Sequence, residues 1–246
     1  MAVDIRVNYM EHDLLGRPLG REGIIASMDK YKIDTAILVP NLAVTCDFRI
    51  GNEHVMQIIK DDPRLYGYFV VNPNYPEESI EMMRRMMSNR KFLAMAIFRG
   101  ASLPYPNLDD CREIINAYRR FTKPVFLHTP DADSVEAAKE IAAAFPTLQF
   151  IFGSMGGADW KRALNLGKLI NVYLETSGSF DVEKIEEAVG KVGAHKVLFG
   201  SDFPLSDPAS EIALIRASNL SKDAMVRIFD QNAVKLFGLG AKTQKE

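Results

Sequence analysis

Short apolar runs alternate with longer stretches of helical period along the chain. Residues of β-branched and aromatic type are concentrated in eight short runs, at residues 4–9, 34–40, 66–72, 93–98, 124–128, 148–153, 171–177 and 196–201. Each run is followed by a stretch in which apolar residues recur every three or four positions. The pattern therefore predicts eight strands, each followed by a helix, and a further helix that closes the chain at Gly238.

Eight strand–helix units in 246 residues are typical of a (β/α)8 barrel, the TIM barrel of the α/β class. No linker or change of composition divides the chain, so we expect one domain over residues 1–246. An open, doubly wound sheet is the alternative. The chain shows no glycine-rich phosphate loop after its first strand, and this favours the closed barrel.

Composition and charge narrow the class of partner. The chain has 30 basic and 32 acidic residues, a net charge of −2 and no long run of like charges, which argues against nucleic-acid and membrane partners. Its two cysteines, Cys46 and Cys111, form no Cys-x-x-Cys motif, and the N-terminus has no secretory signal pattern. We therefore expect a cytoplasmic protein that acts on a small molecule.

Polar residues occur where the predicted strands end, and the active sites of such barrels lie at the carboxyl ends of their strands. In the first strand, alternation places Arg6 and Asn8 on the inward face, an unusual position for a long cation. We predict two catalytic residues, Asp202 and His128. The candidate substrate-binding residues are Arg6, Asn8, Asn72, Arg99, Ser154 and Thr176. Structural roles remain open at this point: His128 could bond a neighbouring loop, Asp202 could cap a helix, and Ser154 could serve only the turn.

Several motifs together resemble the amidohydrolase-related family of the amidohydrolase superfamily, in the branch that holds decarboxylases, hydrolases and lactonases. The motifs that carry the resemblance are DIRVN at 4–8, VVNP at 70–73, FLH at 126–128, SMGG at 154–157, GSDFP at 200–204 and NAVKLFGL at 232–239. The last two are the most specific. The resemblance covers essentially the whole chain and implies a TIM barrel. Members of this family commonly pair, so a homodimer is also expected.

The family pattern also implies a metal site, from which this sequence departs. Two first-strand histidines, the histidine at 128 and the aspartate at 202 would hold the metal, and Arg6 and Asn8 stand in the first two positions. Two unit charges about 4 Å apart interact by about 4 kcal/mol at an effective dielectric near 20, and a divalent ion beside Arg6 would be repelled by about twice that. We therefore expect no cofactor. If a divalent metal such as zinc binds, its ligands are His128 and Asp202.

Three functions follow from the resemblance. The first is a lactonase-like, metal-independent hydrolase of a small carboxylate-bearing molecule, with Asp202 or His128 as general base and Arg6 and Arg99 holding the carboxylate. The second is a metal-dependent hydrolase or decarboxylase, and the third is a noncatalytic descendant that binds a small anion or has a structural role. An enzyme, either a hydrolase or a carbon–carbon lyase, is favoured. We also expect Arg6 and Asp202 to form a hydrogen-bonded ion pair in the mouth of the barrel.

Overall fold

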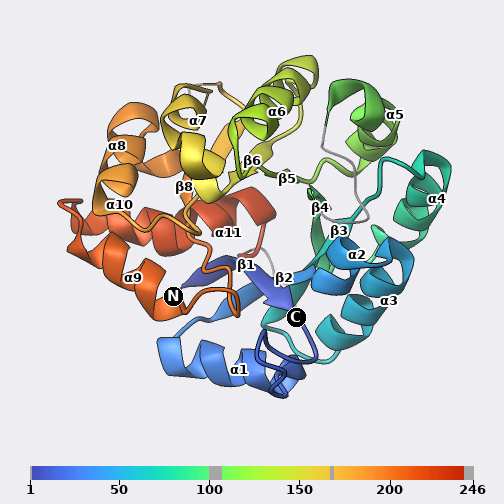
Figure 1. The fold of residues 1–246 in the computed structure, drawn as a ribbon, viewed down its shortest axis with the longest axis horizontal. Coiled ribbons are helices and arrows are strands. Elements are labelled where there is room, and N and C mark those ends of the chain that lie inside the picture. The colour runs from blue at the N-terminus through green and yellow to red at the C-terminus, as the bar shows by residue number, and fades with distance from the viewer. Residues whose placement is uncertain (1, 100–106, 167–168, 241–246) are drawn as a thin grey trace.

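Eight parallel strands run in sequence order around a barrel (Figure 1). The computed structural model describes residues 2–99, 107–166 and 169–240, so the two predicted domain limits, residues 1 and 246, lie outside the described residues. The strands are β1 (Val3–Tyr9), β2 (Thr35–Pro40), β3 (Leu65–Val70), β4 (Phe92–Ile97), β5 (Val125–His128), β6 (Phe150–Gly153), β7 (Val172–Glu175) and β8 (Val197–Leu198). The predicted (β/α)8 barrel is confirmed.

Backbone hydrogen bonds join the last strand to the first. The amide of Ile5 donates to the carbonyl of Phe199 at 3.0 Å, and the amide of Asp202 donates to the carbonyl of Arg6 at 2.9 Å. Phe199 and Asp202 both lie beyond the end of β8, so the chain continues beside β1 after the regular strand has ended. As a result, residues that follow β8 lie against the inward-facing side chains of β1.

Helices surround the sheet and cover its outer face (Figure 1). They are α1 (Gly20–Tyr31), α2 (Asn41–Thr45), α3 (Phe48–Ile59), α4 (Pro76–Met86), α5 (Leu108–Tyr118), α6 (Ala132–Ala144), α7 (Trp160–Leu166), α8 (Val182–Val192), α9 (Pro208–Ala217), α10 (Lys222–Val226) and α11 (Asn232–Phe237). Shorter turns of helix are η1 (Arg119–Phe121), η2 (Ser154–Asp159), η3 (Ala194–Lys196) and the π-helical η4 (Arg227–Gln231). None of the described helices is long and apolar enough to cross a membrane.

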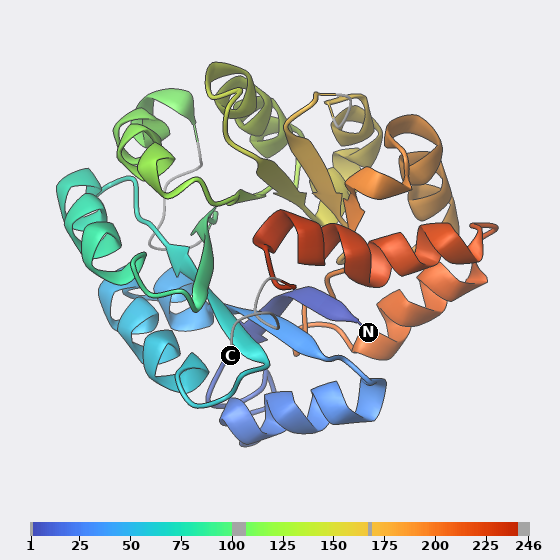
Figure 2. The ribbon, with the colours of Figure 1, turned by 180° about the vertical axis from the view of Figure 1, so that it is seen from behind.

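The closing helix differs from its prediction. The sequence predicts one helix up to Gly238, whereas α10 and α11 are separated by the π-helical turn η4. Figure 2 shows this C-terminal segment crossing the end of the barrel opposite to the face seen in Figure 1. That end is therefore covered, and the other end is left for the site.

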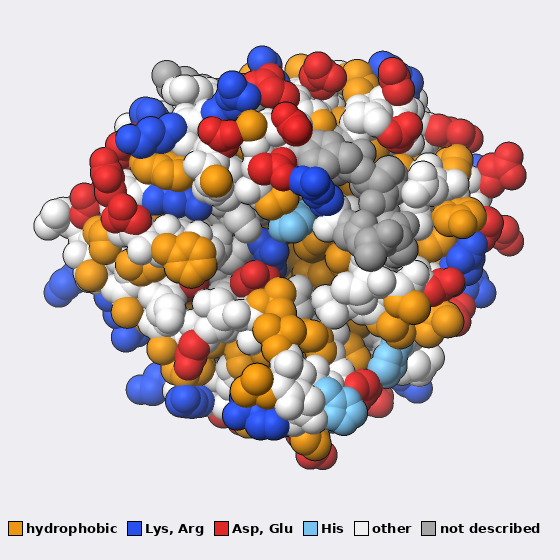
Figure 3. Space-filling view, in the orientation of Figure 1, with side chains coloured by type: hydrophobic (Ala, Val, Ile, Leu, Met, Phe, Trp, Pro, Cys, Tyr) orange, Lys and Arg blue, Asp and Glu red, His pale blue; other side chains and the backbone are white. Residues whose placement is uncertain are grey.

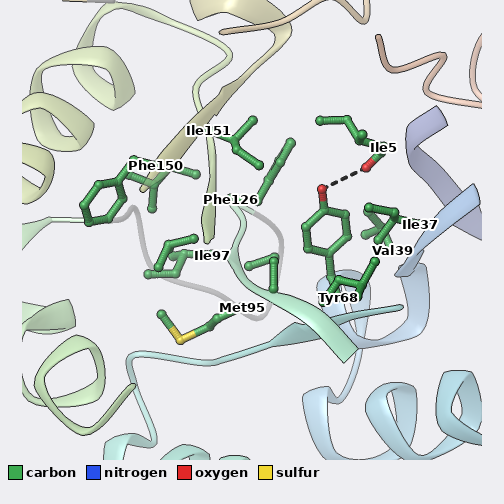
Figure 4. Close-up of a cluster of buried hydrophobic side chains, with 14 of the residues drawn as sticks. Ile5, Ile37, Val39, Tyr68, Met95, Ile97, Phe126, Phe150 and Ile151 are labelled. Carbon is green, nitrogen blue, oxygen red and sulfur yellow. Dashed lines mark hydrogen bonds between the residues drawn. The ribbon is translucent and has the colours of Figure 1, made fainter. Parts of the chain in front are cut away.

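Buried aliphatic and aromatic side chains pack together around the strands (Figure 4). The hydroxyl of Tyr68 donates to the carbonyl of Ile5 at 2.8 Å, and its ring lies 5.3 Å from the ring of Phe126. Gly153 makes room for this packing, because a Cβ there would lie 2.4 Å from Phe126 Cζ. Since Arg6 Cζ lies 5.7 Å from the centre of the same ring, the polar site is built directly on this apolar layer.

Candidate functional site

The face seen in Figure 1 has a hollow at its centre, bordered by histidine, basic and acidic side chains (Figure 3). Strands β1, β5, β6, β7 and β8 bring their carboxyl ends together around this end of the barrel. We call the polar residues gathered there the mouth group: Arg6, Asn8, His128, Ser154, Glu175, Ser177 and Asp202.

Arg6 contacts four other residues of the mouth group. Its Nη1 donates to the hydroxyls of Ser154 and Ser177, both at 2.7 Å, and lies 3.4 Å from Glu175 Oε2. Its Nε lies 2.9 Å from Asp202 Oδ1. The side chain is only 5% exposed. One buried guanidinium therefore connects the end regions of β6, β7 and β8 to β1, and this explains a cation on the inward face of the first strand.

Asp202 lies at the closing seam of the barrel. The ion pair between Asp202 and Arg6 that the sequence predicts is confirmed, although the Nε–H of Arg6 is not aligned for a hydrogen bond. Asn8 Nδ2 donates to the same oxygen, Oδ1, at 2.8 Å. Both contacts orient the carboxylate through Oδ1, while the side chain as a whole is 19% exposed. Asp202 can therefore present Oδ2 to a molecule in the mouth.

Glu175 is the second carboxylate that surrounds Arg6. It is fully buried and accepts hydrogen bonds from the amides of Ser154 (2.9 Å) and Ser177 (2.6 Å) and from the Ser177 hydroxyl (2.9 Å). Gly200 allows this arrangement, because a Cβ at that position would lie 2.1 Å from Glu175 Oε1. The burial of this carboxylate is offset by three donors and one cation.

His128 ends β5 and faces the mouth. Its ring lies 5.3 Å from the ring of Phe98, and its Nδ1 is buried without a hydrogen-bond partner among the described residues. Burial, followed by the positive charge of Arg6, lowers the pKa of His128 to about 3. The imidazole is therefore neutral near pH 7.

Three predicted residues do not join the mouth group. The hydroxyl of Thr176 lies between the ends of β7 and β8, where it bonds the backbone of Gly200. The side chain of Asn72 shapes the turn after β3, where its Oδ1 accepts from the amide of Asn74 at 3.0 Å. Arg99 is half exposed and forms an ion pair with Asp131, yet it lies close enough to His128 to influence its pKa.

Sequence reasoning missed three buried ionisable residues around the mouth group. Burial raises the pKa of Asp4 and of Glu211 to about 7 and lowers the pKa of Lys184 to about 8. Lys184 donates to the carbonyl of Ser154 at 2.9 Å. Asp4 could have been predicted, since it lies two residues before Arg6 in β1 and therefore on the same face of the strand. The two others lie on outer helices, and nothing in their local pattern marks them.

Comparison with known families identifies the chain. A model of the family described as amidohydrolase matches residues 29–239. The chain belongs to the amidohydrolase family. This membership supports the expectation of an enzyme, either a hydrolase or a carbon–carbon lyase. The matched range begins after β1, so Arg6 and Asn8 lie outside it. No curated protein sequence matches the chain.

Solved structures with the same fold include decarboxylases and a hydrolase. The 5-carboxyvanillate decarboxylase of Novosphingobium aromaticivorans, with manganese and 4-hydroxy-3-methoxy-5-nitrobenzoic acid, has a TM-score of 0.79 and 18% identity over 97% of this chain and 96% of that chain. The dihydroxybenzoic acid decarboxylase of Polaromonas, with manganese and 2-nitroresorcinol, has a TM-score of 0.78 and 16% identity over 97% of each chain. A probable 2-pyrone-4,6-dicarboxylic acid hydrolase of Acinetobacter baumannii, with citric acid, has a TM-score of 0.74 and 16% identity over 96% of this chain and 99% of that chain.

These structures correct the expectation that no cofactor is involved, because the two decarboxylases contain manganese and point to a divalent cation rather than none. The side chains seen here do not fit such an ion as they stand. Within the described ranges, no three His, Cys, Asp or Glu side chains come together as ligands. Of the two ligands expected, Asp202 is paired with Arg6, and His128 alone is a single donor. We therefore assign no chemical step to a metal.

Proposed function

We propose that the chain is an amidohydrolase-family enzyme that binds a small carboxylate-bearing molecule in the mouth of the barrel and hydrolyses or decarboxylates it. One observation carries the proposal: a partly exposed carboxylate, Asp202, is fixed by Arg6 and Asn8 in the same mouth as the imidazole of His128, whose Nδ1 has no hydrogen-bond partner among the described residues. A fixed carboxylate and a neutral imidazole in a barrel mouth are typical of acid–base chemistry.

Asp202 is the proton-transfer residue in this proposal. Arg6 and Asn8 contact Oδ1, which sets the direction of the carboxylate. Oδ2 would then take a proton from water during hydrolysis. In decarboxylation it would take the proton of the phenol of an aryl carboxylate and return it to the ring carbon as the bond to carbon dioxide breaks, leaving the phenolate product. The neutral His128 would hold the substrate through its imidazole, as a donor or an acceptor according to its tautomer.

The substrate class rests on charge and on the similar structures. Arg99 presents a half-exposed guanidinium near His128, which suits a carboxylate at the rim of the mouth. The solved structures carry names of enzymes that act on dihydroxybenzoate, carboxyvanillate and a pyrone dicarboxylate, all of them carboxylates on a ring. A planar ring carboxylate is therefore the class to test first.

The test is turnover of three compounds with and without added Mn²⁺: 2,6-dihydroxybenzoate, 5-carboxyvanillate and 2-pyrone-4,6-dicarboxylate. Release of carbon dioxide identifies a decarboxylase, and ring opening identifies a hydrolase. Asp202→Asn should lower kcat by at least 100-fold, which corresponds to about 2.7 kcal/mol, while the exposed Asp133→Asn on α6 should leave it unchanged. If no compound reacts under either condition, the proposed function is wrong.

A further inference from the structure

Lys184 is a buried cation outside the mouth group. It lies on α8, is 2% exposed, and points its Nζ at the carbonyl of Ser154, which accepts at 2.9 Å. The other buried positions of α8 are apolar: Ile185, Ala188 and Val192. Burial of an ammonium group is costly unless a partner compensates for it, and here the partners are one carbonyl and the nearby charges of Glu175 and Glu211.

Ser154 receives this contact in an unusual backbone conformation. Its φ is 57°, and the next three residues, Met155, Gly156 and Gly157, also have positive φ, at 48°, 86° and 55°. Gly157 is pressed against the chain after β5, since a Cβ there would lie 2.0 Å from the carbonyl oxygen of Pro130. Positive φ is unfavourable for residues with a side chain, such as Ser154 and Met155, so tertiary contacts must hold the turn.

All three polar groups of Ser154 are engaged by charged side chains. Its amide donates to Glu175 at 2.9 Å, its carbonyl accepts from Lys184 at 2.9 Å, and its hydroxyl accepts from Arg6 Nη1 at 2.7 Å. Arg6 in turn holds Asp202. A continuous chain of contacts therefore runs from the inner face of α8 through one serine to the carboxylate in the mouth.

We propose that Lys184 is a positioning residue for the reaction: by binding the carbonyl of Ser154 it fixes the turn whose hydroxyl orients Arg6, and through Arg6 it orients Asp202. The expected effect of Lys184 on kcat rests on the function proposed above, whereas its expected effect on the turn at Ser154 does not. Without the ammonium group, the turn loses a partner on the side facing α8, and Arg6 loses a fixed acceptor.

The test is a double-mutant cycle with Lys184→Met and Ser154→Ala. Lys184→Met keeps the length of the side chain and removes the donor, and it should lower kcat about 10-fold or more with less than a threefold change in KM. Ser154→Ala should have a similar effect. The kcat of the double variant should be no lower than that of the less active single variant. Lys191→Met, at an exposed end of the same helix, is the control and should match the wild type. Additive losses would show independent structural damage and overturn the proposal.

A crystal structure of Lys184→Met separates this inference from the proposed function, because it needs no substrate. We expect the distance from Arg6 Nη1 to Ser154 Oγ to exceed 3.5 Å in the variant. An unchanged turn with the contact intact would overturn the proposal even if the enzyme is active. Lys184→Gln, which retains an N–H donor without the charge, is the second variant if Lys184→Met does not fold. It should keep the contact between Arg6 and Ser154, and loss of that contact in this variant would overturn the role given to the N–H donor.

Discussion

Arg6 Nε lies 2.9 Å from Asp202 Oδ1, across the seam where the first strand meets the chain that follows the last strand. Glu175 Oε2 lies 3.4 Å from Nη1 of the same guanidinium, so a single cation compensates two carboxylates. Removal of this cation takes an ion-pair partner from Glu175, which is fully buried, and from Asp202, which is partly exposed. The pair therefore couples the closure of the barrel to the geometry of its mouth.

The first prediction concerns the stability of this pair. Arg6→Met and Asp202→Asn should each lower the free energy of unfolding by about 3–5 kcal/mol, because each change leaves an uncompensated charge or a misaligned donor. The double variant should lose less than the sum of the two single losses. Urea unfolding measures all three. Arg85→Met, which breaks an exposed ion pair with Glu53, should cost less than about 1 kcal/mol. Strict additivity would show that Arg6 and Asp202 do not depend on each other.

The second prediction concerns the protonation state of His128. Its pKa is lowered to about 3, so NMR should show no titration of this imidazole between pH 5 and pH 8. Arg6→Met should raise the pKa towards the ordinary value of 6.5, since the charge of Arg6 is the second cause of the shift after burial. A midpoint near 6.5 in the wild type would show that His128 is neither buried nor close to Arg6.

The third prediction concerns the dependence of stability on pH. Burial raises the pKa of Asp4 from its ordinary 3.8 to about 7, so the folded protein retains a proton that the unfolded chain loses. This contribution is fully present below about pH 4 and is lost as the pH rises through 7, at about 1.4 kcal/mol for each unit at most. Asp4→Asn should therefore gain stability relative to the wild type between pH 5 and pH 8. A difference in stability between Asp4→Asn and the wild type that does not change with pH would refute the raised pKa of Asp4.

The barrel could be predicted because its pattern is local. Each strand is a short apolar run followed by a helical period, and closure makes the first and last strands neighbours, so Arg6 and Asp202 were expected together. The polar strand ends were predicted less well. Alternation at the end of β7 turns Glu175 and Ser177 towards Arg6 and places Thr176 between the strands. A prediction that selects site residues by their type alone does not show this difference.

Residues supplied by outer helices could not be predicted. Lys184 reaches the mouth group only because the turn at Ser154 directs its carbonyl outward to α8, and this depends on four successive positive φ angles. The sequence SMGG shows that a turn is present but not which way its carbonyl points. The homodimer, the cytoplasmic location and the catalytic roles of Asp202 and His128 stay predictions.

The most direct test is a crystal structure of the protein with 4-hydroxy-3-methoxy-5-nitrobenzoate, grown with and without Mn²⁺. This ligand has a ring carboxylate and an unreactive nitro group, and it occupies one of the structures with the same fold. We predict that it binds in the mouth, with one oxygen within hydrogen-bond distance of the His128 imidazole and another of Arg99, beside Asp202 Oδ2. A ligand bound away from these residues under both conditions, or a mouth that stays without ligand at saturating concentration, would contradict the account.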